Sequence, residues 1–372
     1  MPISSDLIHA KQTLSSRLLT AGFRGDVVFR GRTLAVAAAV ASAGRNVHAV
    51  GVGSKIVEGK ATSQQCVRLY VVQKLAESLL PPRDRLPENV DGIPTDIIES
   101  PPAVASPRSR RKNTVASRVA SGRAVTSLVA ADVAAPDTCT IQRQTQQRPV
   151  VAGISAANHD VTAGTLGYFC RSTRQGDDPT QVCVLSNNHI FANLNRAQVG
   201  DALYQPGPAD GGVAGDHFAD FLRCVPLQLD GTSPNRIDAA IGKLLSGLNA
   251  SIEICSIGKI TGIGRATENM TVRKHGRTTG YTEGTVTDEL IDALVAMDTN
   301  DPKAVALFQN QFRIVPSLTF PAIGKGGDSG SLVVKQDTAQ AVGLYFANPP
   351  TGEYGYASHI ADVLHDLEIE LL

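Results

Sequence analysis

The segment Gly-Gly-Asp-Ser-Gly-Ser at 326–331 has the residue types of a nucleophile loop. Glycines on both sides of a serine permit a tight turn that exposes the hydroxyl and directs backbone N–H groups at one point. Ser329 is therefore the candidate nucleophile, and the N–H groups of Gly327 and Ser329 form the candidate oxyanion hole. The alternative is an ordinary glycine-rich loop, so the hypothesis needs partner residues elsewhere in the chain.

A serine hydroxyl is a weak nucleophile unless a histidine accepts its proton and a carboxylate orients that histidine. Among the eight histidines, His189 is distinctive because it follows the apolar run at 182–185 through Ser-Asn-Asn. A strand ending there would present the imidazole at the rim of a barrel. His217 is the main rival, since Asp216 and Asp220 are close in sequence, and a structural role is the alternative for every histidine.

Asp238 interrupts the otherwise apolar sequence Ile-Asp-Ala-Ala-Ile at 237–241. Burying a carboxylate is costly unless it is hydrogen-bonded. An acid set among isoleucine and alanine therefore requires a partner, and His189 is the natural one. The alternative is that Asp238 lies at a strand edge and faces solvent.

In the order His189, Asp238, Ser329, these residues resemble the catalytic triad of the chymotrypsin-like (trypsin-like) serine peptidases, whereas the subtilisin and α/β-hydrolase orders do not fit. The segment Gly-Arg-Thr-Thr-Gly at 276–280 is similar to one in bacterial α-lytic and streptogrisin-type peptidases. In series with LSNNHIFA (185–192), QPGPADGG (205–212) and GDSGSLVV (327–334), it resembles bacterial trypsin-like peptidases related to the plant NARROW LEAF protein.

The resemblance implies a mainly β fold with two antiparallel barrels, at about residues 148–248 and 252–358, closed by a helix at about 358–368. His189 and Asp238 from the first barrel would then meet Ser329 from the second in the cleft between them. The implied activity is that of a serine endopeptidase, acting on a protein or peptide through an acyl-enzyme without cofactor or metal. The alternative is a catalytically silent scaffold or regulatory binding module.

The resemblance also implies supporting residues. A cation from the 272–281 stretch should pair with Asp328 and order the loop without proteolytic activation, with Lys274 first and Arg277 second. An extended substrate is expected to pair with the backbone of Phe346, Ala347 and Asn348. Ile323 lies where trypsins carry an acidic residue, so a preference for Lys or Arg is not expected. Because the disulfides of animal trypsins are missing, we expect a bacterial, cytoplasmic protein.

Composition supports these expectations. The 35 basic and 35 acidic residues cancel, which removes the electrostatic reason for binding nucleic acid or an anionic membrane. The apolar stretch at 34–43 is too short to span a bilayer and is expected to be a core helix. The six cysteines show no metal-ligand spacing and are expected to be mainly buried thiols, with Cys170 and Cys183 as the best candidate pair.

The pattern along the chain predicts four parts. Residues 1–44 read as a helical arm that packs on the domain or mediates a homo-oligomer, and residues 45–100 as a small α+β domain. Residues 101–147 read as a linker, whose basic run at 108–112 is either a solvated stretch or a processing or docking site. Residues 148–372 carry the short strands of the peptidase-like domain.

Overall fold

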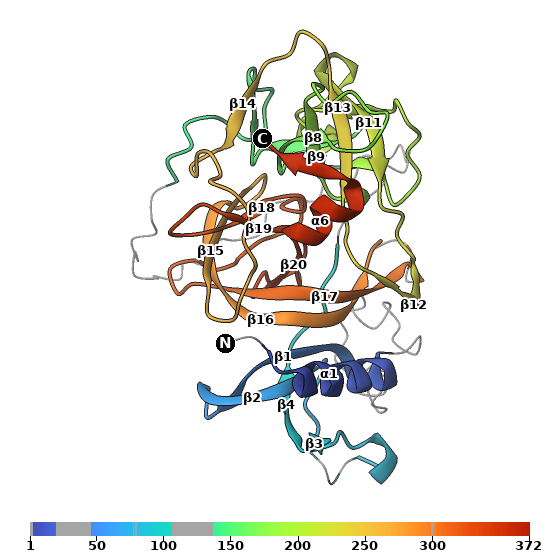
Figure 1. Cartoon of the computed structure of the whole chain (residues 1–372), viewed down its shortest axis with the longest axis vertical. Helices are drawn as coiled ribbons and strands as arrows, with labels where there is room; N and C mark the ends of the chain where they lie inside the picture. Colours follow the sequence, from blue (N-terminus) through green and yellow to red (C-terminus); the bar gives the residue numbers. More distant parts are fainter. Residues whose placement is uncertain are drawn as a thin grey trace, which may run out of the picture.

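The computed structural model describes residues 3–19, 46–76, 78, 80–105, 137–298, 301 and 303–372. Within them the chain forms two curled β sheets of eight and eleven strands and a separate pair of strands. The N-terminal strands of the larger sheet lie with a helix on one side of the molecule (Figure 1). The core helix predicted at 34–43 and the basic run at 108–112 lie outside the described residues. No helix in the described part is both long and apolar enough to cross a membrane.

The first barrel is a sheet of eight strands in the order β21-β8-β9-β13-β11-β10-β6-β7. At its centre Leu185 on β9 lies opposite Ile241 on β13, and both side chains are in the core. Alternate residues of such short strands point inward, and their side chains fill the interior of the barrel. The strands are β6 (Ser155–Asn158), β7 (Gly164–Thr165), β8 (Tyr168–Ser172), β9 (Cys183–Ser186), β10 (Ala202–Tyr204), β11 (His217–Cys224), β13 (Ala240–Leu244) and β21 (Ile369–Leu371). A separate parallel pair joins β5 (Val150–Ala152) to β14 (Ala250–Ile254).

The second barrel closes on itself, because β16 pairs with β15 along one edge and with β17 along the other. The first part of β16 alternates between buried and half-buried residues, as a strand with one solvent-facing side should. Its last seven residues are all buried, because the N-terminal region covers them. The strands are β15 (Thr271–Gly276), β16 (Gly280–Ala296), β17 (Val305–Pro316), β18 (Leu332–Lys335), β19 (Ala341–Ala347) and β20 (Gly355–His359), with β12 (Asp230–Asn235) added parallel to β17.

The N-terminal sheet continues the second barrel across the predicted domain boundary. Strand β1 pairs antiparallel with β16, with Ala49 opposite Ala293, so one hydrogen-bonded sheet runs from the barrel into β1, β2, β4 and β3. Helix α1 (Ser5–Leu18) begins at Ser4, whose hydroxyl accepts a bond from the Leu7 N–H. Figure 1 shows α1 lying against this sheet, whose strands are β1 (Val47–Val57), β2 (Lys60–Val71), β3 (Asn89–Val90) and β4 (Ile93–Glu99).

Helix α6 (Ile360–Leu367) follows β20 and packs Ile360, Val363 and Leu367 into the core of the first barrel. The other short helices are α5 (Asn188–Phe191) and the 3-10 turns η2 (Pro82–Asp84), η3 (Pro208–Asp210) and η4 (Ala214–Asp216). The fold class predicted from the sequence is confirmed: a mainly β double barrel with a C-terminal helix.

The start of the expected linker packs against the barrel, and the expected cysteine pair does not form, although four of the six cysteines are free thiols as expected. Residues 101–105, expected to be linker, are buried or half-buried and bridge to Ala296 and Asn348. Cys139 and Cys255 form a disulfide across 116 residues, whereas Cys170 and Cys183 lie opposite each other on β8 and β9 as free thiols. Both free thiols are buried in an apolar core, which raises the pKa of Cys183 to about 11.

Candidate active site

Ser329 lies in the turn that precedes β18, and two glycines there have backbone conformations that other residues rarely adopt. Gly327 has φ +100° and Gly330 has φ +97°. A Cβ on Gly330 would come within 2.2 Å of both the Ser186 Oγ and the Thr165 carbonyl oxygen. The glycines therefore permit the turn and also let the second barrel approach the first at the serine.

The loop is bonded directly to the first barrel. The Thr165 N–H donates to the Ser329 carbonyl at 2.8 Å, and the Thr165 hydroxyl donates to the Gly327 carbonyl at 2.9 Å. Ser186, at the end of β9, donates from its hydroxyl to the Thr165 carbonyl at 2.8 Å. Three residues later the same chain reaches His189, so these bonds fix the serine loop against the segment that carries the candidate base.

His189 and Asp238 form a buried pair. The His189 Nδ1 lies 2.5 Å from Asp238 Oδ2, and the His189 N–H donates to Asp238 Oδ1 at 3.2 Å. Neither residue has exposed surface. Asn187 donates from its side chain to the Asp238 carbonyl at 2.7 Å, which fixes the backbone of that residue as well. Because a carboxylate on Nδ1 leaves Nε2 as the basic nitrogen, the pair has the geometry of an oriented proton acceptor.

The candidate nucleophile and the candidate base are not hydrogen-bonded to each other in this structure. The Ser329 hydroxyl donates to the Phe346 carbonyl at 3.0 Å, and His189 Nε2 has no partner among the described residues. Hydroxyl groups rotate readily, and catalytic hydrogen bonds often form only when substrate is bound. The reacting arrangement therefore requires Ser329 to exchange the carbonyl for the imidazole.

The predicted oxyanion hole has two available donors. Within the described residues, neither the Gly327 N–H nor the Ser329 N–H donates to another protein group. The neighbouring N–H of Asp328 is occupied, since it donates to the Lys325 carbonyl at 3.0 Å. The loop thus leaves unbonded the two amides that a negatively charged oxygen would need.

Asp328 is fully buried and heavily hydrogen-bonded. Its carboxylate accepts from the N–H groups of Thr278, Thr279 and Lys325 at 2.7, 3.1 and 2.9 Å, and from the Thr279 hydroxyl at 2.8 Å. Lys274 Nζ lies 3.4 Å from Asp328 Oδ2. Burial works to raise the pKa of Asp328, but the cation and these donors outweigh it and hold that pKa below its usual value.

Arg277, the second candidate for this ion pair, lies elsewhere. Its guanidinium binds Asp210 with two hydrogen bonds, of which the one from Nε is 2.6 Å long. Asp210 belongs to the predicted QPGPADGG segment and also accepts a bond from Ser155 at 2.6 Å. Arg277 therefore pairs with Asp210 and not with Asp328. The acid in the segment at 205–212 was the only signal in the sequence for this partner.

The remaining predicted site residues lie on or beside β19. Phe346 and Ala347 end this strand and are buried, and Asn348 follows them. Asn348 exchanges backbone hydrogen bonds with Val104, at 3.0 and 3.3 Å. The edge at which a substrate was expected is therefore already paired. Ile323 lies in the core of the second barrel and not at the site.

His217, the rival base, lies on β11 and is half-buried. Its Nε2 is 2.8 Å from Asp220 Oδ1, three residues along the same strand.

Within the described residues, one further group of side chains has the residue types of metal ligands: Cys139, Cys255 and His275, whose ligand atoms lie within 4.8 Å of one another. Both sulfurs are used by the disulfide, so we assign no metal to it.

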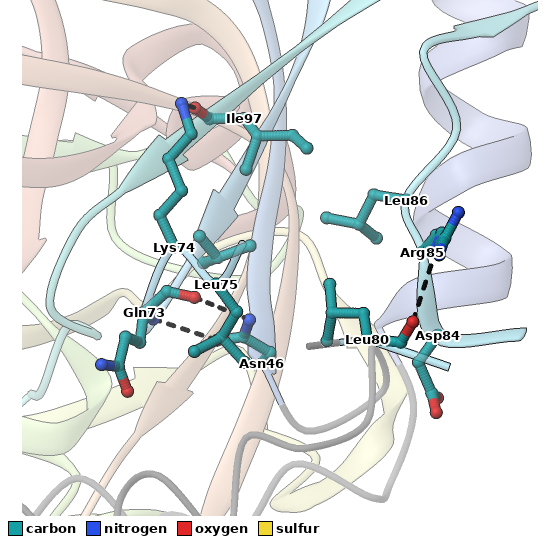
Figure 2. Close-up of a pocket in the computed structure, with 10 residues that line it drawn as sticks. Asn46, Gln73, Lys74, Leu75, Leu80, Asp84, Arg85, Leu86 and Ile97 are labelled. Carbon is teal, nitrogen blue, oxygen red and sulfur yellow. Dashed lines mark hydrogen bonds between the residues drawn. The ribbon is translucent and has the colours of Figure 1, made fainter. Parts of the chain in front are cut away.

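A pocket of about 160 Å³ lies away from these residues, between β2, β4 and the segment at 80–86 (Figure 2). Leu75, Leu80, Leu86 and Ile97 supply its apolar side chains. The polar groups at its margin bond mainly to one another; for example, the Gln73 N–H donates to Asn46 Oδ1 at 3.0 Å (Figure 2). It contains no histidine or serine and has no part in the candidate active site.

The two curled sheets, with the Ser329 loop bonded to both, form the double β barrel that the sequence resemblance implied. No known family model and no curated protein matches the chain. Among solved structures it is similar to Thermobifida fusca protease A (15% identity, TM-score 0.41) and Nocardiopsis protease (16%, 0.42), in each case over 60% of this chain and 98% of the other. It is also similar to an α-lytic protease homologue (18%, 0.39, over 59% and 97%). Nothing in these similarities bears on catalysis.

Proposed function

We propose that this protein is a serine endopeptidase in which His189, Asp238 and Ser329 form the catalytic triad. The observation that carries the proposal is the buried His189–Asp238 pair at 2.5 Å. Among the described residues the outer nitrogen of His189 has no partner, and neither do the Gly327 and Ser329 amides. Burying a carboxylate beside an imidazole costs free energy of desolvation, and such buried titratable pairs are concentrated at functional sites. Proton transfer from Ser329 to His189 is the function that fits the serine and the amides of the adjoining loop.

In the proposed reaction, His189 takes the Ser329 proton as the serine oxygen attacks a peptide carbonyl. Asp238 holds the Nδ1–H and stabilises the imidazolium that forms. The N–H groups of Gly327 and Ser329 bind the oxyanion. His189 then gives the proton to the leaving amine, and water hydrolyses the acyl-enzyme by the same route.

The second candidate function is a catalytically silent scaffold or binding module, and two observations favour it. Ser329 is bonded to the Phe346 carbonyl instead of the imidazole, and the paired strand at Asn348 leaves no open edge. A fluorophosphonate probe separates the two candidates, because it modifies only an activated serine. A single adduct on Ser329, located by peptide mass, supports the enzyme, whereas an unmodified protein supports the scaffold.

The triad assignment is tested on hydrolysis of peptide substrates. Ser329→Ala and His189→Ala should each lower kcat by about 10⁴ to 10⁶, and Asp238→Asn by about 10⁴ through loss of the correct tautomer. His217→Ala is the matched control, since this histidine also pairs with an aspartate, and it should leave kcat unchanged. A loss of activity in His217→Ala but not in His189→Ala would transfer the role of base to His217.

A further inference from the structure

Residues 101–105 run as an extended segment alongside the end of β19. The Val104 N–H donates to the Asn348 carbonyl at 3.0 Å, and the Asn348 N–H donates to the Val104 carbonyl at 3.3 Å. This reciprocal pair is an antiparallel β bridge. It forms at Asn348, one of the residues whose backbone a bound peptide was expected to pair with.

The direction of the segment is that of a substrate. In an antiparallel pair, residues that follow Val104 lie opposite residues that precede Asn348. The segment therefore advances toward Phe346, whose carbonyl accepts the Ser329 hydroxyl. A peptide attacked by Ser329 must likewise approach with its N-terminal part along the strand and its carbonyl end at the serine.

The segment is held on its other edge as well. The Ala105 N–H donates to the Ala296 carbonyl at 3.0 Å, and the Ala296 N–H donates to the Ala103 carbonyl at 3.4 Å. The Tyr354 hydroxyl donates to the Pro101 carbonyl at 2.6 Å. The segment therefore lies between β16 and the end of β19, as an added strand would.

The side chains of the segment fit a narrow apolar space. Ala103 is 1% exposed and Ala105 is fully buried, and both lie in the same apolar cluster as Leu194 and Phe346. Val104 points away from this cluster, because successive side chains alternate along an extended chain. Because both side chains are buried in this cluster, a larger side chain at position 103 or 105 would have to displace its neighbours.

We propose that residues 101–105 occupy the acyl-side substrate groove as an intramolecular ligand, which a peptide substrate must displace. The inference rests on the proposed peptidase function. It also specifies the substrate class: an extended peptide with small apolar side chains at the positions of Ala103 and Ala105. Because the ligand is tethered, it competes at an effective concentration of about millimolar, above that of most free peptides.

Two substitutions should expel the segment. Ala105→Asp places a charge at a fully buried site, which is costly without a partner. Val104→Pro removes the N–H that bonds to Asn348 and leaves the side chain apolar. Tyr354→Phe is a third, milder variant that removes the hydroxyl bond to Pro101. The matched control is Ala61→Asp, the same change at an exposed position of β2.

The assay measures kcat and KM for a chromogenic peptide with alanines at the two small positions. A tethered competitor raises the apparent KM but leaves kcat unchanged at saturation. Loss of one net hydrogen bond corresponds to about a tenfold change in such an equilibrium, so KM should fall about tenfold in Val104→Pro with kcat unchanged. Ala105→Asp should show at least the same fall, and Ala61→Asp none.

Fluorophosphonate labelling of Ser329 in the same proteins separates failure of this inference from failure of the proposed function. If Ser329 is labelled in all of them but KM does not fall in any segment variant, the segment is merely structural and the inference is overturned. If no protein is labelled, the proposed function fails. The inference is then decided by calorimetry with the peptide acetyl-Pro-Pro-Ala-Val-Ala-amide, which should bind Val104→Pro at least tenfold more tightly than the unaltered chain.

Discussion

Replacing Lys274 by methionine should damage the serine loop far more than an ordinary lysine substitution. Lys274 is 1% exposed and lies 3.4 Å from Asp328, which is fully buried. Methionine keeps most of the side-chain volume but removes the charge. Breaking a buried ion pair in this way typically costs about 3–5 kcal/mol, because the remaining charge has no counter-ion.

The structure places the expected loss near the lower end of that range. Asp328 keeps four hydrogen bonds from Thr278, Thr279 and Lys325 when Lys274 is removed. The ion pair itself is long, and Lys274 also bonds to the Thr279 hydroxyl at 3.1 Å. We therefore expect a loss of about 3 kcal/mol in the free energy of unfolding at pH 7.

The loss should depend on pH with a defined sign. The pKa of Asp328 is lowered in the folded protein, so this residue stabilises the fold above its unfolded pKa of 3.8. That stabilisation disappears as the pH falls through the lower, folded pKa. Without Lys274 the folded pKa rises, and acid neutralises the unpaired charge earlier. The difference between Lys274→Met and the unaltered chain should thus shrink below about pH 4.

The assay is urea denaturation at pH 7 and pH 3, together with the rate of fluorophosphonate labelling at Ser329. Lys335→Met is the matched control, because Lys335 pairs with the exposed Asp337 at 3.2 Å and such surface pairs contribute at most about 1 kcal/mol. Adding Asp328→Asn to Lys274→Met should recover part of the lost stability. If Lys274→Met costs no more than Lys335→Met, the ion pair does not order the loop.

Three further predictions concern the rest of the chain. Burial lowers the pKa of His48 from 6.5 to about 4, so the fold should lose up to about 3 kcal/mol as the pH falls between these values, and His48→Gln should flatten that slope in denaturation curves. Cys255→Ser should cost about 2–4 kcal/mol, and alkylation of the unfolded, unreduced chain should modify four of the six cysteines; six would disprove the disulfide. The homo-oligomer remains a prediction from sequence: light scattering should give a multiple of 39.1 kDa, and a monomer mass would refute it.

The fold class could be predicted because it depends on local patterns. Short apolar runs ended by Gly, Asn and Asp predict strands and turns, and the final helix follows from the spacing of Ile360, Val363 and Leu367. The acid at Asp238 could be singled out because an apolar sequence makes a buried charge conspicuous. Each of these signals lies within a few residues of the feature that it predicts.

The features that sequence missed depend on contacts between distant parts of the chain. The pairing of β1 with β16 joins residues more than 200 positions apart, and nothing in either strand specifies its partner. Lys11 was not singled out, although it forms a buried ion pair with Asp292 that fixes α1 to the barrel. The sequence predicts a linker at residues 101–105, because Pro-Pro-Ala-Val-Ala shows no periodic pattern of large apolar residues. The burial of this segment depends on bridges to Ala296 and Asn348, which lie about 200 residues or more further along the chain.

Assembly of the site depends on the same contacts that hold the barrels together. The Thr165 N–H bonds to the Ser329 carbonyl, while its hydroxyl accepts from the Arg277 N–H and donates to the Gly327 carbonyl. One residue of the first barrel thus fixes the candidate nucleophile, the proposed oxyanion amides and the start of the loop that binds Asp328. Since His189 belongs to the first barrel and Ser329 to the second, loosening this junction should separate the proposed base from the proposed nucleophile before either barrel unfolds.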